Sequence, residues 1–306
     1  MSLSIPRALA LALAWLLASL SSQAALAQQE VRIGAAHFPP YTVRPEKGSD
    51  TGLLPELVAA LNQLQSAYHF VLVPTALARR FQDLKQGRLD MAIFENPQWG
   101  WQHIDHVAVD MGLEDAEVFV ALRQPGRAED YFEDLGGKRL ALFNGYHYAF
   151  AGFDADPVWL GSHFNATLTY SHDSNLQMVL RDRADVAPIT RSYLIDYLKR
   201  SPELGDRLMM SERIDQVYHH YAILRPEAPI SAAVFQGYLQ QLRDNGDLQR
   251  IFEPFQIAVL VPPALPLPGG GSLSVTPSPG NTSTGRSMPG KPSPGVPPAR
   301  SKAASE

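Results

Sequence analysis

One short phrase occurs twice in the chain and constrains its fold more than any other feature. Residues 87–93 read Gly-Arg-Leu-Asp-Met-Ala-Ile, and residues 182–189 read Asp-Arg-Ala-Asp-Val-Ala-Pro-Ile. Each copy follows a stretch with helical spacing and begins a short apolar run, as expected where a helix leads into a strand. Two similar α/β lobes are therefore predicted. A site shared by two such lobes lies where helix starts and strand ends face a common cleft.

The rest of the central region alternates between strand and helix. We expect strands at residues 31–36, 70–73, 91–94, 117–122, 138–143, 168–170 and 218–224, and helices at 52–61, 79–86, 174–180 and 230–244. Ser174 and Asn175 are expected to cap the third helix. The alternation predicts a mostly parallel sheet. The strands at 117–122 and 218–224 would carry the chain between the lobes twice, which makes a hinge.

This reading divides the chain into four parts. Residues 28–118 and 222–257 form the first lobe, and residues 119–221 form the second. Residues 1–27 form a signal peptide, and residues 258–306 form a disordered tail rich in Pro, Gly and Ser. The fold class predicted from this order is α/β, with two lobes and two hinge crossovers.

The first 27 residues resemble a cleavable secretory signal. Arg7 precedes an apolar run over residues 8–20, and small residues at 25–27 provide an exit for cleavage. A membrane anchor is the alternative, but the run is shorter than the roughly 20 apolar residues that span a bilayer. The chain has no cysteine, so a lipid anchor of the usual bacterial kind is not expected. We expect a mature protein that begins near Gln28 and lies in the periplasm.

Composition separates a globular region from the tail. Hydrophobic residues make up 45% of the chain and charged residues 19%, which is ordinary for a protein with a sizeable core. The net charge of -5 and the pI near 6.0 argue against a nucleic-acid binder. From about Val261 the chain becomes a low-complexity segment that cannot offset its own ordering entropy. We expect a spacer, with weak electrostatic contact to cell wall or anionic lipid as the alternative.

Six phrases, in this order and spacing, resemble the family 3 extracytoplasmic solute-binding proteins. They are the opening 31–41 with its Phe-Pro-Pro-Tyr, the helix start 51–57, Gly-Arg-Leu-Asp at 87–90, the strand entry 135–140, Ala-Asp-Val at 184–186, and Leu-Arg-Asp-Asn-Gly-Asp-Leu at 242–248. The resemblance extends over roughly residues 29 to 256. It implies the bilobed type 2 fold of periplasmic binding proteins.

Two ligand anchors of the amino-acid-binding members are missing. In the family, an Arg shortly after the third strand grips the ligand's α-carboxylate, for which Lys is a poor substitute. Here residues 95–102 contain no Arg. The family's acid for the ligand ammonium falls near Thr190. The resemblance therefore implies a small polar ligand held by other residues.

Several residues are candidates for that role. Arg79 begins a helix and could hold an anion, or it could only pair with an acid at the surface. The turn at residues 144–146 could cradle a carboxylate or phosphate with its N–H groups. Glu95 could accept a hydrogen bond from a ligand amine or point to water. Aromatic residues at the expected cleft rim, Trp101 and Tyr148 among them, could bind a planar, sugar or cationic ligand or serve in packing. The full candidate set is Phe38, Tyr41, Arg79, Glu95, Asn96, Trp99, Asn144, Gly145, Tyr146, Ser174 and Thr190.

The sequence contains few motifs that are typical of enzymes or metal-binding proteins. There is no Gly-x-Ser-x-Gly elbow, Walker loop or His-Glu-x-x-His. Glu95 and His147 as an acid and base of a dehydratase remain an alternative, since relatives of this fold act on cyclic acids. His103 and His106 share a helical spacing, while the adjacent His219 and His220 point to opposite faces of a strand. We expect no catalytic residue, no metal and no cofactor.

The function predicted from these observations is capture of a small polar solute, amino-acid-like or another small acid or amine, by a monomeric periplasmic binding protein. Transport would require a separate permease and ATPase of an ABC-type importer. A protein that senses a ligand and signals to a membrane receptor is the alternative.

Overall fold

The structure, a computed structural model, describes residues 28–262. The predicted signal peptide, and the predicted tail from residue 263 onward, lie outside the described residues. Within the described part, no helix combines the length and apolar character needed to cross a membrane.

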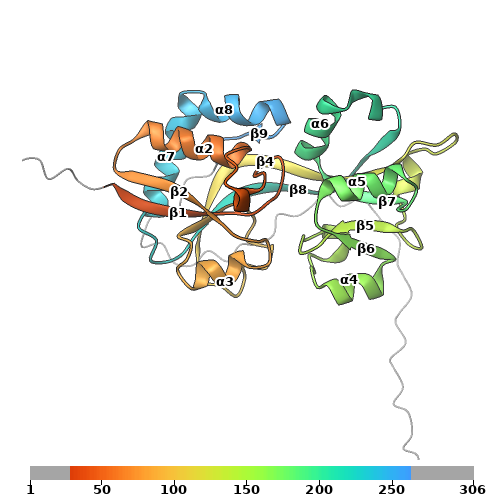
Figure 1. The fold of residues 1–306 in the computed structure, drawn as a ribbon, viewed down its shortest axis with the longest axis horizontal. Coiled ribbons are helices and arrows are strands. Elements are labelled where there is room, and N and C mark those ends of the chain that lie inside the picture. The colour runs from red at the N-terminus through yellow and green to blue at the C-terminus, as the bar shows by residue number, and fades with distance from the viewer. Residues whose placement is uncertain (1–27, 263–306) are drawn as a thin grey trace, which may run out of the picture. The chain divides into compact units, whose positions relative to one another are not determined.

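A single mixed sheet runs through the described chain (Figure 1). Its strand order is β2-β1-β3-β8-β4-β7-β5-β6, and β9 pairs with β4. The strands are β1 (Gln29–Ala35), β2 (Tyr68–Pro74), β3 (Met91–Glu95), β4 (Val107–Leu122), β5 (Leu140–Phe143), β6 (Ala166–Thr169), β7 (Val186–Thr190), β8 (Leu208–Leu224) and β9 (Ala258–Val259). Pairing is parallel between β1 and its neighbours β2 and β3, and between β5 and its neighbours β6 and β7. It is antiparallel around β4 and β8, so the predicted parallel sheet is correct at both ends and wrong in the middle.

Two long strands, β4 and β8, join the two ends of the sheet. They have 16 and 17 residues and pair antiparallel along most of their length. The sequence pattern predicted only residues 117–122 and 218–224 of them. Charged residues in the middle, such as Asp115 and Asp215, interrupt the apolar pattern there. The two strands are the two crossovers that the sequence predicted.

Helices cover the two ends of this sheet separately (Figure 1). The α-helices are α2 (Leu53–Leu64), α3 (Arg80–Lys85), α4 (Pro157–His163), α5 (His172–Leu180), α6 (Arg191–Arg200), α7 (Ala232–Asp244) and α8 (Asp247–Phe252). Short 3-10 helices are η2 (Pro45–Lys47), η3 (Glu129–Phe132), η4 (Ala149–Ala151), η5 (Pro202–Leu204) and η6 (Glu253–Phe255). The predicted cap of α5 is corrected, because Ser171 is the N-cap and its side chain accepts a hydrogen bond from the Ser174 N–H. Ser174 lies inside the first turn.

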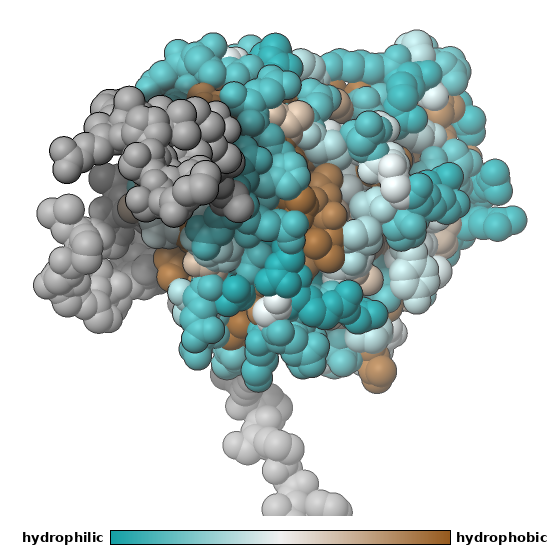
Figure 2. Space-filling model, turned by 60° about the vertical axis from the view of Figure 1, so that its left-hand side comes forward, coloured by the Kyte–Doolittle hydropathy of each residue, from teal (hydrophilic) through white to brown (hydrophobic). Residues whose placement is uncertain are grey.

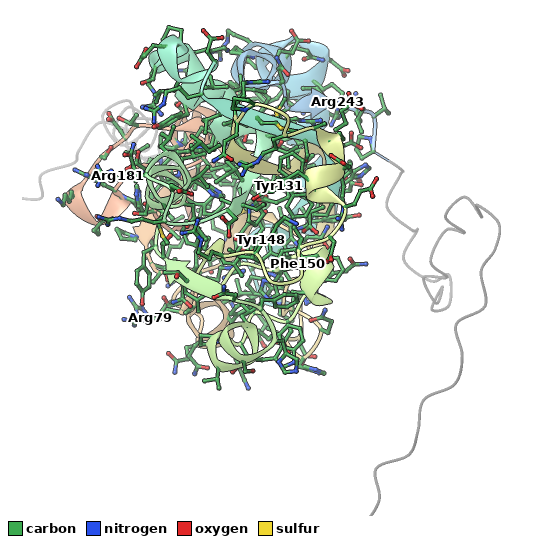
Figure 3. The ribbon with its side chains drawn as sticks, turned by 90° about the vertical axis from the view of Figure 1, so that its right-hand side faces the viewer. Arg79, Tyr131, Tyr148, Phe150, Arg181 and Arg243 are labelled. Carbon is green, nitrogen blue, oxygen red and sulfur yellow. The ribbon has the colours of Figure 1, made fainter. Side chains whose placement is uncertain are left out.

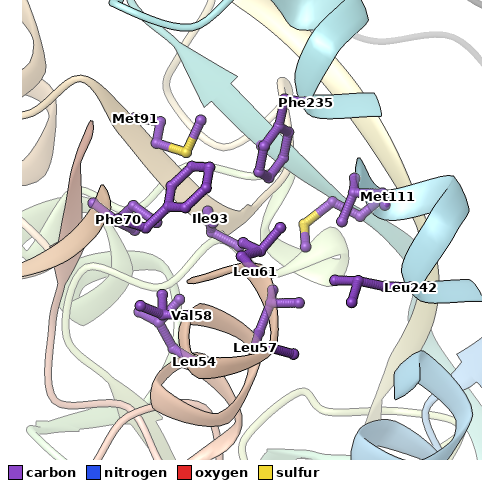
Figure 4. Close-up of a cluster of buried hydrophobic side chains, with 14 of the residues drawn as sticks. Leu54, Leu57, Val58, Leu61, Phe70, Met91, Ile93, Met111, Phe235 and Leu242 are labelled. Carbon is purple, nitrogen blue, oxygen red and sulfur yellow. The ribbon is translucent and has the colours of Figure 1, made fainter. Parts of the chain in front are cut away.

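In the first lobe, one apolar cluster lies among β1–β3, α2, α7 and α8, and another, which contains Leu84, Leu89 and Trp101, lies beside α3. Helix α2 contributes Leu54, Leu57, Val58 and Leu61 at helical spacing, and the strands and α7 contribute the facing side chains (Figure 4). Phe235 of α7 is fully buried against this cluster. Burial of such apolar area is the main term that stabilises the lobe.

The second lobe contains β5–β7 and α4–α6 around two further apolar clusters. One lies against α5 and α6, and the other contains Phe132, Phe143 and Tyr148. Phe38 from the first lobe packs against this last cluster as well as its own. The apolar packing therefore continues from one lobe to the other at this point.

The start of the predicted tail, at residue 258, is corrected. Strand β9 pairs with Leu113 and Glu114 of β4, and the Leu260 N–H donates to the Gly112 carbonyl at 2.7 Å. The folded chain thus extends past the predicted boundary. Hydrophilic residues cover most of the face in Figure 2, with a group of hydrophobic residues near its middle. Such limited apolar exposure is ordinary for a globular protein.

Candidate functional site

A cavity of about 80 Å³ lies between the two lobes. It is bordered by the ends of β1 and β3, the loop after β1, the turn after β5, and the crossover strand β8. Its lining residues are Gly34, Ala36, Phe38, Tyr41, Thr42, Leu54, Thr75, Leu77, Arg80, Ala92, Ile93, Phe94, Glu95, Trp99, Gly145, Tyr146, His147, Tyr218 and His220. The cavity therefore lies at strand ends, as the sequence predicted from the repeated phrase.

A buried ion pair forms the polar end of this cavity. Arg80, at the first position of α3, is 5% exposed, and its Nε lies 2.6 Å from Oε1 of Glu95 at the end of β3. The Trp101 Nε1–H donates to the other Glu95 oxygen at 2.9 Å. The guanidinium also donates to the Leu77 carbonyl and lies 4.2 Å from the centre of the Phe81 ring. Both charges are compensated, as buried charges require.

The neighbouring Arg79 does not line the cavity. Its side chain is 66% exposed, pairs with Asp83 at 3.6 Å, and lies at the outer edge of the molecule in Figure 3. The expectation that Arg79 faces the cleft is therefore corrected in favour of Arg80. Successive residues of a helix project about 100° apart, so a one-residue difference decides which arginine is buried.

Aromatic rings from both lobes meet across the cavity. Phe38 of the first lobe stacks with Tyr146 of the second, with ring centres 5.7 Å apart and planes 4° apart. Trp99 lies 5.8 Å from Tyr146 and 5.0 Å from Tyr218 of β8. Offset and edge-to-face pairs at these distances are favourable beyond their buried area. They give the cavity an apolar, aromatic wall.

The turn after β5 contributes backbone and imidazole groups. Gly145 and His147 line the cavity, and Gly145 has a φ of 79°, which a side chain would strain. Asn144 does not line it, and its N–H donates to the Thr169 carbonyl. Burial, together with the charge of Arg80, lowers the pKa of His147 to about 4. The imidazole is therefore neutral at pH 7 and able both to donate and to accept a hydrogen bond.

A buried carboxyl group lies behind the second-lobe wall. Glu117 of β4 is fully buried, accepts a hydrogen bond from the Tyr146 hydroxyl at 2.8 Å, and lies 3.2 Å from the Thr190 hydroxyl. His172 Nε2 bonds with the same Thr190 oxygen at 2.9 Å. Burial raises the pKa of Glu117 well above its ordinary value and lowers the pKa of His172 to about 3. Thr190 thus supports the wall from behind and does not line the cavity.

A second buried carboxyl group lies at the crossover. The Tyr41 hydroxyl donates to Asp115 at 2.7 Å and lies 2.8 Å from Nε2 of His220. Burial raises the pKa of Asp115 and lowers the pKa of His220 to about 3. Tyr41 and His220 line the cavity, whereas Asp115 is fully buried beneath them.

Of the predicted site residues, the structure brings Phe38, Tyr41, Glu95, Trp99, Gly145 and Tyr146 to the cavity. Asn96 is half-buried outside it, with its side chain donating to the His219 carbonyl, and Ser174 is exposed. Arg80, Tyr218 and His220 also line the cavity and were not predicted from the sequence. The expected return strand at 218–224 carried a signal for the last two, because alternate residues of a strand face the same side.

Within residues 28–262, no three or more His, Cys, Asp or Glu side chains lie close enough together to hold a metal ion. His219 contacts Asp110 at 3.0 Å, while its neighbour His220 contacts Tyr41. The adjacent histidines thus have different partners, as the alternation along a strand requires.

Comparison with known proteins identifies the fold. The sequence matches no model of a protein family. No curated protein matches it. Among solved structures, a histidine kinase sensor domain with similarity to periplasmic binding proteins is 19% identical, with a TM-score of 0.58 over 77% of this chain and 99% of that chain. The probable amino-acid ABC transporter extracellular-binding protein ytmK from Bacillus subtilis is 17% identical, with a TM-score of 0.57 over 75% of this chain and 98% of that chain.

A third similar structure is the GluR0 ligand-binding core from Nostoc punctiforme in complex with L-glutamate. It is 13% identical, with a TM-score of 0.56 over 74% of this chain and 99% of that chain. Each of the three similarities extends over nearly the full length of the other protein. At these identities the similarity shows the fold, which is the two-lobed type 2 fold of periplasmic binding proteins with two crossovers. The fold predicted from the sequence is confirmed.

Proposed function

We propose that this chain binds a small solute between its two lobes, in the cavity that Arg80 and Glu95 border. The observation that carries the proposal is the lining itself, to which both lobes and one crossover strand contribute side chains. Two similar structures are the probable amino-acid ABC transporter extracellular-binding protein ytmK and the GluR0 ligand-binding core in complex with L-glutamate. We take residues 28–118 with 222–259, which include β9, as one lobe and 119–221 as the other.

The chemistry of the lining supports a compact ligand with an apolar, planar part and one polar end. The aromatic wall of Phe38, Trp99 and Tyr146 favours a ring or other flat surface. At the other end, Arg80 and the neutral His147 offer hydrogen-bond donors. Glu95 balances the charge of Arg80, so the polar end has no large net charge to attract a dianion. The lobes would separate to admit the ligand and close around it.

Two biological settings fit this activity. We propose a monomeric, periplasmic binding protein that serves an ABC-type importer, a role that the transporter-associated structural relative supports. A sensor that passes the closed form to a membrane receptor is the second candidate, supported by the similarity to the histidine kinase sensor domain. The six sequence phrases support a divergent relative of the family 3 solute-binding proteins in either setting.

A dehydratase built on Glu95 and His147 is disfavoured by the contacts of Glu95. Both of its carboxylate oxygens are occupied, one by Arg80 and the other by Trp101. These contacts neutralise Arg80 and hold Trp101, which supports a structural role for the carboxylate.

The test is a thermal-shift screen of residues 28–306 against amino acids, organic acids, aromatic amides, polyamines and sugars. A ligand at 100 times its Kd should stabilise the protein by about 2.7 kcal/mol. Arg80→Gln should abolish the shift, and the matched variant Arg79→Gln should keep it, because only Arg80 lines the cavity. A ligand that stabilises both variants equally would place its site elsewhere and contradict the proposal.

A further inference from the structure

Asp115 occupies the crossing point of strand β4. Leu113 and Glu114 pair with β9 of the first lobe, and the residues from Glu117 onward pair with β7 of the second. Asp115 belongs to neither of these ladders and pairs only with Tyr218 of the other crossover strand. Its side chain is fully buried. Burying a carboxyl group costs free energy unless other groups pair with it, so the partners of Asp115 determine whether it is stable at the junction of the two lobes.

Residues of both lobes contact this one carboxyl group. From the first lobe, the Tyr41 hydroxyl donates to Oδ2 at 2.7 Å. From the second lobe, Arg191 at the first position of α6 places Nε 3.7 Å from Oδ1. The backbone N–H of Ala116 donates to the same Oδ1 at 2.7 Å. Asp115 therefore bridges a loop of one lobe and a helix start of the other.

The crossover strands hold the partners of this bridge in place. His220 of β8 lies 2.8 Å from the Tyr41 oxygen, so Tyr41 is fixed between the two crossover strands. Helix α6 follows directly on β7, which is paired with β4 from Glu117 to Ala121. A rotation of the lobes changes the separation between the Tyr41 loop and α6. Asp115 cannot then keep both contacts, because its two oxygens are about 2.2 Å apart and each contact weakens steeply with distance.

We propose that Asp115 is a positioning residue that sets the balance between closed and open lobes by joining Tyr41 to Arg191 in the closed form. This inference rests on the proposed function, since it requires lobes that move about β4 and β8. Asp115 does not line the cavity and has no contact with a ligand in this role. Its effect on ligand affinity is indirect, through the fraction of molecules that is closed before the ligand arrives.

The distance between the lobes can be measured without a ligand. The chain has no cysteine, so Lys85→Cys on α3 and Ser162→Cys on α4 provide two unique, exposed sites for spin labels, one in each lobe. Pulsed electron paramagnetic resonance then gives the populations of short and long separations. In this background, Asp115→Ala should raise the ratio of open to closed molecules about tenfold, because a buried hydrogen bond to a charged group is lost. Asp115→Asn keeps one acceptor oxygen but turns an NH2 donor toward either Tyr41 or the Ala116 N–H and Arg191, so it should also raise the open fraction, by less than Asp115→Ala.

Asp110→Ala is the matched control. Asp110 lies on the same strand and is nearly as buried, but its partners Gly112 of β4 and His219 of β8 both belong to the crossover strands, so it does not join a loop or helix of one lobe to one of the other. Its removal should leave the distance distribution unchanged. Tyr41→Phe deletes only the hydroxyl donor and should shift the distance distribution in the same direction as Asp115→Ala. It keeps the proposal testable if Asp115→Ala does not fold. Distributions for Asp115→Ala or Tyr41→Phe that match the parent would overturn the proposal. The distance measurement uses no ligand, so its outcome does not depend on whether the ligand screen finds one.

Discussion

The two copies of the repeated phrase hold their aspartates by the same contacts, one in each lobe. In the first lobe, the Arg32 N–H donates to Asp90 Oδ2 at 2.8 Å, and the Asp90 N–H donates back to the Arg32 carbonyl at 2.8 Å. In the second lobe, Arg139 and Asp185 make the same two bonds at 2.7 and 2.8 Å. Each arginine side chain also forms an ion pair with its aspartate. We call these two arrangements the first and second clip.

The clips occupy the same place in their lobes. The first precedes the pairing of Ile33 with Met91, and the second precedes the pairing of Leu140 with Val186. Each therefore aligns a strand with its parallel neighbour at the first paired residue.

Their surroundings differ. The side chain of Asp90 is 2% exposed and receives a second arginine, Arg225, which follows strand β8. The side chain of Asp185 is 24% exposed, and Arg139 also binds Asp182 in the helix-to-strand turn. Burial raises the pKa of Asp90, but hydrogen bonds from Arg32 and Arg225 outweigh it and keep the pKa below its ordinary value. The same local sequence thus forms a clip with a buried aspartate and two arginine partners in the first lobe. In the second lobe it forms a clip whose aspartate is partly exposed to solvent.

The largest effect is expected from Asp90→Ala. It removes the buried acceptor of two partly exposed arginines and leaves their charges facing each other, which costs about 2 kcal/mol in the free energy of unfolding, the value of a hydrogen bond between charged groups. Urea denaturation followed by far-UV circular dichroism at pH 7 measures this loss. A loss no greater than that of Asp185→Ala would show that burial does not separate the clips.

The pH dependence of Asp90→Asn sharpens the comparison. The folded-state pKa of Asp90 is lowered, so its charge stabilises the fold at pH values above about 4, the unfolded value, and this contribution disappears as the pH falls through the folded value. The difference in unfolding free energy between the parent and Asp90→Asn should therefore be largest near neutral pH and shrink below pH 4. A constant difference down to pH 2.5 would mean that the charge of Asp90 is not what stabilises the first clip.

A smaller effect is expected from Asp185→Ala. Its ion pair is exposed to solvent, and exposed pairs contribute about 1 kcal/mol or less. The effect should also weaken at high salt, because solvent-exposed charges are screened. Urea denaturation with and without 0.5 M NaCl tests both points, and a salt-independent loss as large as that of Asp90→Ala would contradict them.

The smallest effect concerns the turns before the clips. Gly87 and Asp182 both have positive φ, at 68° and 55°. Gly87→Ala introduces a Cβ that meets no atom within 4 Å, so its cost is the left-handed backbone alone, about 1 kcal/mol. Asp182→Ala starts from a residue that already bears this strain and should cost less. Thermal unfolding of the two variants ranks them, and the reverse order would show that the Asp182 contact to Arg139 matters more than backbone strain.

Much of the fold followed from local patterns. Gly87 ended a predicted helix at the right place, and the apolar runs after both clips became β3 and β7. The crossover strands were found only in part, because their central residues are charged and read as loop. Of the site, the aromatic residues Phe38, Tyr41 and Trp99 were predicted because they lie in segments expected at the cleft rim, and the structure places them at the cavity.

The arginine of the site could not be assigned from the sequence. Arg79 and Arg80 are adjacent residues of the same type, so the sequence does not distinguish them. Which of the two faces the cavity depends on the rotation of α3 about its axis relative to the sheet. Only Arg80 meets Glu95 and Trp101, residues 15 and 21 positions away along the chain, in a buried position. A charge of this kind is stable only where its partner is supplied by another element.

The sequence by itself determined many of the local elements and the repeat of two lobes, because turns, helix ends and strand starts depend on residues close in the chain, but helices α4, α6 and α8 were not predicted. The tertiary structure alone decided which carboxyl groups are buried and what they join. Asp115 becomes the contact of Tyr41 and Arg191 only when segments 74 and 76 residues away are packed against it. Burial and pairing between distant residues are properties of the packed chain, and no local pattern encodes them.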